Sequence, residues 1–512
     1  MVTPLSALLW SPPGLLPAAV SGAFNEHQLV VYLGAVGLVI VVSGLVSGFV
    51  ERGPISQVLV FVALGVAVGP SGLGVIDLGI ESPAVQVLAT VSLVLVLFTD
   101  AIKINLGQLK TNWVLPALAL GPGAFLTIGV IGVMALVIFG LPWQLALLVG
   151  TILASTDAVL LRDVTRDPRL PLSVRHTLSI EAGANDLIVL PLTLLLAALA
   201  SGEARSAGSW AQFALGLLVL GPLVGIIIAV VGVRAVDWLR RKRMIRRDYE
   251  SLYSLGLAFL AYAAAQNLGG SGFIAAFAAG LTIAMIDVEL CDCFLEYGET
   301  TAEVAMLLTF VFLGASLVTA AFDAFGGATL LFALLALFVA WPLAFIVALA
   351  RSTASWDGKL LLAWFGPRGL NSLLLLILAV AEGMPQTDRI FGIVSVVVLA
   401  SIVLHGTSAT PLSAWYGRQV KSHVLPEETL ADASRLLHVG RDAVDNVPRM
   451  LPVDLKQCLS DGLPTTILDV RRQSAFGGDP RRIPGAIRMT VDEIPTRPRE
   501  IPKGIPIVLY CT

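Results

Sequence analysis

The segment SIEAGANDL, residues 179–187, decides how this sequence folds, because it sets two carboxylates and an amide inside an apolar run. Glu181, Asn185 and Asp186 lie within the run 177–200, which contains no other charged residue. An ionisable side chain at mid-bilayer costs about 2.5–3.5 kcal/mol on insertion scales, so such residues mark functional sites. Glu181 and Asn185 share a helix face, whereas Asp186 is turned about 100° from Asn185. One helix can therefore present two polar surfaces.

The composition around this segment indicates a membrane protein. Of the 512 residues, 56% are hydrophobic and 13% are charged, about half the charged share of a soluble domain. The apolar residues come in runs of about 18 to 25, the length that crosses a bilayer. We therefore predict an all-α polytopic membrane protein with about 13 transmembrane helices. The predicted spans are 28–50, 55–70, 84–102, 113–139, 143–161, 177–200, 210–236, 250–267, 271–286, 300–320, 327–350, 358–381 and 390–411.

Basic residues fall in alternate loops, which sets the orientation because cytoplasmic loops retain positive charge. Arg162 and the cluster 240–247 share one side, whereas the opposite side carries Arg205 and Arg389. This pattern predicts a multi-pass inner-membrane protein with its N-terminus outside and its C-terminus in the cytoplasm. The predicted inside loop 287–299 is acidic and departs from the pattern.

Composition divides the chain into four parts. Residues 1–26 contain a short apolar stretch without a basic start, which makes a poor signal peptide and is interpreted as an extracytoplasmic leader. Residues 27–416 hold every predicted span and form a transmembrane domain. Closely spaced charged residues follow in a cytoplasmic linker, 417–446, and an α/β pattern begins over 447–512.

One predicted span is interrupted beside a group of polar side chains. Gly150 and Thr151 lead into Ser155, Thr156 and Asp157, and we expect the helix to break there. The hydroxyl and carboxylate oxygens are hard ligands suited to a small alkali cation.

A second interruption occupies the matching place in the other half of the chain. Gly366, Pro367 and Gly369 surround Arg368, a cation deep in its span. Paired interrupted spans indicate a transporter site, because freed carbonyls and half-helix ends can bind an ion where lipid cannot reach. We predict that Arg368 forms a structural ion pair with Glu181, which leaves Asp186 to face a water-filled cavity.

Other polar residues carry weaker signals. Asp100 lies near the end of its span and is interpreted as a carboxylate that reaches the membrane surface beside Lys103. The four cysteines are too scattered for a disulfide framework or a zinc site. We expect no cofactor and no nucleic-acid partner.

Three motifs, taken together and in order, resemble prokaryotic sodium/proton antiporters of the cation/proton antiporter superfamily. The resemblance covers roughly residues 27–415, and the joint occurrence is specific although each motif alone is weak. It implies inverted repeats, two interrupted crossing helices, a mobile core domain and a homodimer. The motifs are Ser-Thr-Asp157, Glu181-x-x-x-Asn185-Asp186 and Gly-Pro-Arg368-Gly.

The resemblance also implies the roles of the site residues, with sodium and protons as transported substrates. Two departures bear on the choice of ion: Ala182 stands where many relatives carry Ser, and Thr99 where many carry Glu. The Asn-Asp pair resembles members that exchange one cation for one proton. By this match sodium binds Asp157 and Asp186 with oxygens of Thr156 and Ser155, and the supporting residues are Glu181, Asn185 and Arg368.

Segments of the tail resemble the beginning of a rhodanese domain. LPTTILDVR, 463–471, reads as a strand, IPGAI, 483–487, as a turn, and IPIVLYC, 505–511, as the strand that delivers Cys511. In that family the cysteine heads a loop whose amides stabilise a thiolate. The sequence stops at Thr512, before that loop, so we expect a partial rhodanese-like domain without sulfurtransferase activity.

Three functions compete with a sodium/proton antiporter: a potassium/proton antiporter, a membrane-anchored rhodanese-like sulfurtransferase or redox sensor, and an ion channel. An anchor does not need the buried charges of Asp157, Asp186 and Arg368. A channel requires a continuous polar pore. We therefore predict a secondary active antiporter, not an enzyme, that works by alternating access around a buried aspartate and serves sodium transport and pH homeostasis.

Overall fold

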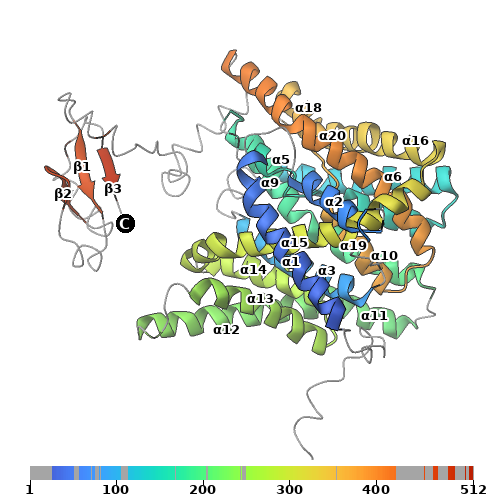
Figure 1. Ribbon diagram of the computed structural model, residues 1–512, viewed down its shortest axis with the longest axis horizontal. Helices are drawn as coiled ribbons and strands as arrows, with labels where there is room; N and C mark the ends of the chain where they lie inside the picture. Colours follow the sequence, from blue (N-terminus) through green and yellow to red (C-terminus); the bar gives the residue numbers. More distant parts are fainter. Residues whose placement is uncertain are drawn as a thin grey trace, which may run out of the picture. The chain divides into compact units, whose positions relative to one another are not determined.

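The computed structural model divides into a helical unit, Met1–Ser434, and a tail unit, Arg435–Thr512 (Figure 1). The predicted leader lies outside the described residues except for Glu26, as do Cys511 and the linker beyond Ser422. The structure describes residues 26–422 apart from 51–56, 71, 75–79, 81, 105–113, 166, 168, 203–205, 243, 245–248, 287 and 353, and in the tail 455, 465–470, 482–489, 502 and 507–510.

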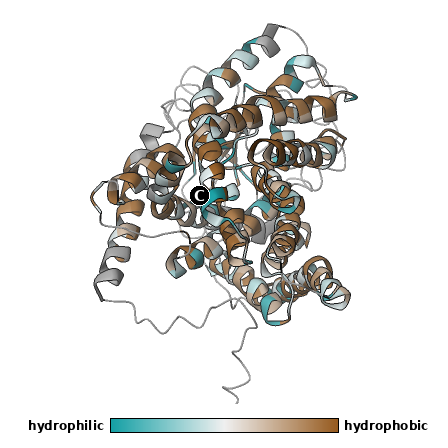
Figure 2. Ribbon diagram, turned by 90° about the vertical axis from the view of Figure 1, so that its right-hand side faces the viewer, coloured by the Kyte–Doolittle hydropathy of each residue, from teal (hydrophilic) through white to brown (hydrophobic). Residues whose placement is uncertain are grey.

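The helices follow the apolar runs of the sequence, and Figure 2 shows them mostly in the colour of hydrophobic residues. Three of them contain a π-helical turn, labelled η. The elements are α1 Glu26–Val50, α2 Gln57–Val68, α3 Pro83–Lys103, α5 Val114–Leu118, η2 Ala119–Gly123, α6 Ala124–Phe139, α7 Trp143–Ala154, α8 Arg162–Thr165, α9 Leu172–Ala184, α10 Asp186–Ala200, α11 Ala207–Leu215, η3 Gly216–Leu220, α12 Gly221–Arg241, α13 Glu250–Asn267, α14 Gly272–Ile286, α15 Val288–Asp323, α16 Gly327–Leu335, η5 Ala336–Ala340, α17 Trp341–Leu349, α18 Trp356–Trp364, α19 Leu370–Ala381 and α20 Thr387–Ser422.

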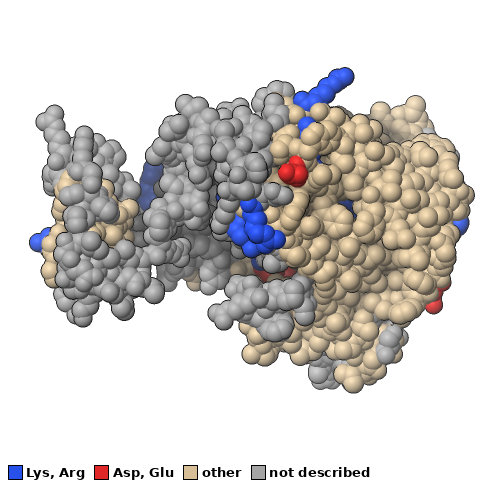
Figure 3. Space-filling view, turned by 90° about the horizontal axis from the view of Figure 1, so that it is seen from above, with Lys and Arg blue, Asp and Glu red and all other residues tan. Residues whose placement is uncertain are grey.

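Several helices are suited to cross a membrane. Within the described residues, six are long and apolar enough to do so, and α15, which bends by 44° between Gly314 and Ser316, makes a seventh. Shorter apolar helices such as α7 and α19 accompany them. On the face in Figure 3 the described surface is mostly uncharged, and side chains such as Leu45 and Val137 are exposed. A bilayer is the environment that can cover so much apolar surface. The chain is thus a polytopic helical membrane protein.

The acidic segment 287–299 is not the loop that the sequence predicted, because from Val288 onward it is the beginning of helix α15. Glu299 lies 2.5 Å from Nη2 of Arg162 and 3.3 Å from Nζ of Lys103. Glu303, one turn later, lies 2.7 Å from Nη1 of Arg162. Basic residues from two other segments thus neutralise Glu299 and Glu303.

Close contacts between helices depend on small residues. Helix α12 packs along α14, which in turn packs on α3 and α13, and Figure 1 shows α12, α13 and α14 side by side. At Gly225 of α12 an added Cβ would overlap the carbonyl oxygen of Ala275 on α14. Helix association in membranes relies on such close backbone approach, since lipid supplies no hydrophobic driving force.

The tail contains a small parallel sheet. Its strands are β1 Thr466–Asp469, β2 Ile487–Arg488 and β3 Ile507–Tyr510, and both outer strands pair with β1 in the order β2-β1-β3. The strands lie within or beside the three segments from which the sequence predicted an α/β pattern. The rhodanese-like assignment itself stays a prediction.

We predict that Gly225→Ala destabilises the helical unit, because overpacking at a close contact typically costs about 1–3 kcal/mol. Gly256→Ala on α13 is the matched control, since an added Cβ there meets no atom within 4 Å. Thermal unfolding in detergent should show a lower midpoint for Gly225→Ala and an unchanged or slightly higher one for Gly256→Ala. Equal midpoints for the two variants would contradict the packing argument.

Candidate functional site

The first interruption lies where α7 ends at Ala154 and the chain continues through the extended segment 155–157. Sequence reasoning placed its start at Gly150 and Thr151, but both are helical. Gly150 serves a different purpose, since an added Cβ would overlap a backbone oxygen of α6. The break begins instead at Ser155, and within it the Asp157 carboxylate accepts the N–H of Val159, a local bond that competes with helical hydrogen bonding.

The second interruption lies at 365–369, between α18 and α19, as predicted from the sequence. Pro367 has no N–H to continue a helix. The two glycines allow close approach: a Cβ on Gly366 would overlap the ring of Trp341, and one on Gly369 would overlap the carboxylate of Asp157.

The two interruptions hydrogen-bond to each other, and the place where they meet is called the crossing below. The N–H of Asp157 donates to the Pro367 carbonyl at 3.0 Å, and the Asn371 amide donates to the Thr156 carbonyl at 3.2 Å. Each broken segment therefore satisfies backbone groups of the other, as irregular backbone within a membrane requires.

Asp157 is fixed by backbone amides. Its Oδ2 accepts the N–H of Leu370 at 2.8 Å, and its Oδ1 accepts the N–H of Val159 at 2.9 Å. Leu370 begins α19, so the carboxylate lies at the positive end of that helix dipole. Asp157 therefore stabilises both interruptions whether or not it also binds an ion.

Asp186 differs because only neutral side-chain donors contact it. Ser155 Oγ donates to Oδ1 at 3.2 Å, and Asn371 Nδ2 to Oδ2 at 3.3 Å. Asp186 is 2% exposed, and within the described part of the chain no Lys or Arg lies within 4.0 Å of its oxygens. The sequence analysis did not single out Asn371, which stands two residues beyond the Gly-Pro-Arg368-Gly motif.

Glu181 and Asn185 form a directed chain of hydrogen bonds with Thr156. Asn185 Nδ2 donates to the Ala154 carbonyl at 2.8 Å and to Thr156 Oγ1 at 3.3 Å. Thr156 Oγ1 then donates to Glu181 Oε1 at 3.2 Å. The structure thus brings six of the seven predicted site residues together through side-chain or backbone contacts around 155–157.

Arg368 does not form the ion pair with Glu181 that the sequence predicted. No described carboxylate lies within 4.0 Å of its guanidinium, although the charge of Glu181 acts on it from farther away. Its Cζ lies 4.2 Å from the ring centroid of Trp341, a cation–π contact. Glu181 and Arg368 thus interact through their charges without the direct contact expected from the sequence, and an indole from α17, which Gly366 admits, lies beside the guanidinium.

Asp100 is buried, at 5% exposed, instead of reaching the surface beside Lys103. Helix α3 approaches α9 at Gly183, where an added Cβ would lie 3.9 Å from the Asp100 Cβ. The charge of Asp100 acts on Asp186. A third carboxylate therefore belongs to the electrostatic surroundings of the crossing.

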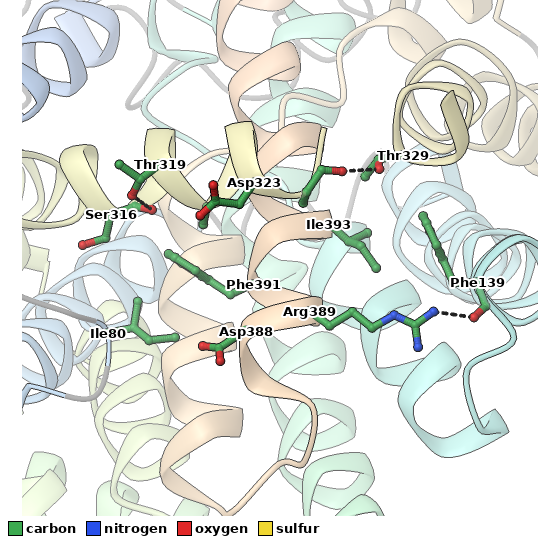
Figure 4. Close-up of a pocket in the computed structure, with 12 residues that line it drawn as sticks. Ile80, Phe139, Ser316, Thr319, Asp323, Thr329, Asp388, Arg389, Phe391 and Ile393 are labelled. Carbon is green, nitrogen blue, oxygen red and sulfur yellow. Dashed lines mark hydrogen bonds between the residues drawn. The ribbon is translucent and has the colours of Figure 1, made fainter. Parts of the chain in front are cut away.

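A cavity of about 730 Å³ lies elsewhere, at the end of α15 and the start of α20 (Figure 4). Asp323, Asp388 and Arg389 are on its wall, and the Arg389 guanidinium donates to the Phe139 carbonyl at 2.6 Å. None of the predicted ion ligands lines this cavity.

Comparison with known proteins agrees with this geometry. Residues 37–415 match the family described as sodium/hydrogen exchanger, transmembrane. The K(+)/H(+) antiporter NhaP of Alkalimonas amylolytica is 26% identical over 404 residues, which cover 78% of this chain and 69% of the relative. The K(+)/H(+) antiporter NhaP2 of Shewanella sp. (strain ANA-3) is 30% identical, with 73% of this chain and 65% of the relative covered. For the Na(+)/H(+) antiporter NhaP of Pseudomonas aeruginosa the identity is 30%, with 64% of this chain and 80% of the relative covered.

The fold also matches a solved structure. The sodium proton antiporter MjNhaP1 from Methanocaldococcus jannaschii superposes with a TM-score of 0.63 at 22% identity, covering 75% of this chain and 98% of the other. These relatives are ion antiporters and not enzymes. The chain aligns with about two thirds of the length of the first two relatives. With three quarters of its length matched to one family, and with the predicted motifs at the crossing, the chain belongs to the transmembrane sodium/hydrogen exchangers as a prokaryotic cation/proton antiporter.

Proposed function

We propose that this chain exchanges sodium for protons across the cell membrane, and that Asp186 is the carboxylate that binds either ion. The observation that carries the proposal is that no described Lys or Arg lies within 4.0 Å of the Asp186 carboxylate. It is buried at the crossing with neutral partners, so no fixed cation competes with a transported one. When a proton and a cation require the same oxygens, binding of one excludes the other, and this competition couples the two fluxes.

The ligands of the proposed cation site come from both interruptions. Ser155 and Thr156 supply hydroxyl or carbonyl oxygens, and Asp157 keeps a lone pair on each oxygen beyond its backbone bonds. Hard oxygen ligands of this kind suit an alkali cation. Glu181 and Asn185 orient Thr156, whereas Arg368 carries a fixed charge that cannot be lost as a proton.

Potassium is the rival substrate, because two of the relatives above are named for potassium and one for sodium. Both ions would bind the same oxygens at Asp186. Proton flux in everted vesicles, driven in turn by sodium, potassium and lithium, distinguishes them.

We also propose thirteen membrane crossings in the inner membrane, with the N-terminus outside and the C-terminus inside, and a homodimer.

Inverted repeats are supported by the order of the elements. A helix with a π turn, η2 or η5, precedes each interrupted helix, α7 or α18–α19. The parallel strands of the tail support a rhodanese-like beginning, for which we propose no enzymatic activity.

We predict that Asp186→Asn abolishes cation/proton exchange while the protein still folds, because the amide is nearly isosteric but cannot carry the charge or exchange the proton. Exchange should fall to background, with a thermal unfolding midpoint within about 3 °C of wild type. Asp237→Asn is the control, since its carboxylate is 40% exposed beside Arg240. Wild-type rates in a folded Asp186→Asn protein would refute the assignment.

Asp157→Asn should differ from Asp186→Asn by losing stability as well as transport. An amide offers one acceptor oxygen where the N–H groups of Leu370 and Val159 require two, and an unsatisfied buried donor costs about 1–3 kcal/mol. Thermal unfolding of both variants in one detergent measures the difference. Equal unfolding midpoints for Asp157→Asn and Asp186→Asn would show that the Asp157 carboxylate does not stabilise the fold through these two hydrogen bonds.

Exchange should be electroneutral and slow at acid pH. Protons compete with cations for the same carboxylates, so the apparent KM for the cation should rise by up to about tenfold per pH unit as acidity increases. An imposed membrane potential at fixed ion gradients should leave the rate unchanged. The measurement uses proteoliposomes, and rates that follow the potential would contradict one-for-one exchange.

A further inference from the structure

Three polar residues share one face of α20 beside the second interruption. Ser401, His405 and Ser408 are four and three residues apart, a spacing that aligns them on a helix. Ser401 is fully buried and His405 is 4% exposed. Neither has a part in the binding site proposed above.

These residues bind groups at the break between α18 and α19, where the Trp364 carbonyl also accepts the N–H of Gly366 at 2.9 Å. Ser401 Oγ accepts the N–H of Arg368 at 2.6 Å. His405 Nε2 lies 3.2 Å from the carbonyl oxygen of Trp364, the last residue of α18. The indole N–H of Trp364 donates to Ser408 Oγ at 3.1 Å. Helix α20 thus contacts the last residue of α18 and the backbone just before α19.

The imidazole of His405 lies between Trp364 and Ser401. Its Nε2 lies 3.2 Å from the Trp364 carbonyl oxygen, and its Nδ1 lies 3.0 Å from both the Oγ and the carbonyl oxygen of Ser401. A carbonyl only accepts, so a ring nitrogen that carries a hydrogen can donate to the carbonyl beside it. With the hydrogen on Nε2, the ring donates to Trp364 and Ser401 Oγ donates to Nδ1. This tautomer links Trp364, through Ser401, to Arg368.

We infer that His405 is a positioning residue that fixes the interruption at 365–369 and, with it, the first turn of α19. That turn carries the Asn371 amide, which donates to Asp186, and the Leu370 N–H, which donates to Asp157. A shift of the interruption moves both donors relative to the two carboxylates. The inference rests on the proposed function, because it assigns His405 an effect on cation binding at Asp186.

The test compares His405→Gln with His405→Met in proteoliposomes. Glutamine offers an N–H for Trp364 and an oxygen for Ser401, whereas methionine fills the space without a donor. The apparent KM for sodium or potassium should rise about tenfold in His405→Met, because losing one buried hydrogen bond weakens binding by about that factor. In His405→Gln the apparent KM should stay within about twofold of wild type. The maximal rate should change less than KM. Thr407→Ala, an exposed position on the same helix, is the control.

A wild-type KM in His405→Met, or an equal rise in both variants, would overturn the inference. If His405→Met does not fold, Ser401→Ala decides, because it keeps the ring but removes its link to Arg368; an unchanged KM there would also overturn it. Hydrogen–deuterium exchange of the peptide that spans 364–370 gives a measurement independent of transport. Exchange should be faster in His405→Met than in His405→Gln, and equal rates would count against the positioning role. Absence of ion exchange in the wild type would contradict the proposed function instead.

Discussion

Two stretches of non-helical backbone, 155–157 and 365–369, lie among apolar helices, where hydrocarbon offers no hydrogen-bond partner. Each exposed amide or carbonyl must therefore be satisfied inside the protein. Asp157 binds two amides, Pro367 accepts one, and Ser401 and His405 satisfy further groups from α20. Helices α19 and α20 and the end of α9 each place a polar side chain against one of the two stretches, through Asn371, Ser401 and Asn185.

The same requirement separates the roles of the acids. The carboxylate of Asp157 binds the start of α19 and Val159, so moving it would disturb that helix and the turn before α8. Asp186 is contacted by side chains that can rotate, Ser155 and Asn371. A group that must release one ion and accept another benefits from partners that adjust without a change in the backbone. Burial and chemistry alone would not distinguish these two aspartates, but their partners do.

Much of this arrangement could be predicted from the sequence, because charge inside an apolar run is rare and costly. The interrupted spans and the cluster around Asp186 follow from local composition. The partner of Arg368 does not, since Trp341 comes from another helix and nothing near it in sequence indicates the contact. The burial of Asp100 was missed for a similar reason, since it depends on the packing of α3 against other helices, among them α9 at Gly183. The acidic beginning of α15 was misread as a loop because its neutralising partners, Arg162 and Lys103, are more than a hundred residues away.

The π turn η5 ends one residue before Trp341, and a π turn contains one residue more than the α-helical turn it replaces. Deleting one residue of Ala336–Ala340 would restore a regular turn and leave the two halves of the helix in nearly the same relative orientation, because the π turn holds its extra residue locally. Deleting one residue of the regular helix α16 would instead rotate one half by about 100° relative to the other. The indole would then face away from the Arg368 guanidinium even though every residue that contacts the site was retained. The number of residues in this helix is therefore as much a part of the site as their identity, and an alignment that places its gap there misassigns the tryptophan.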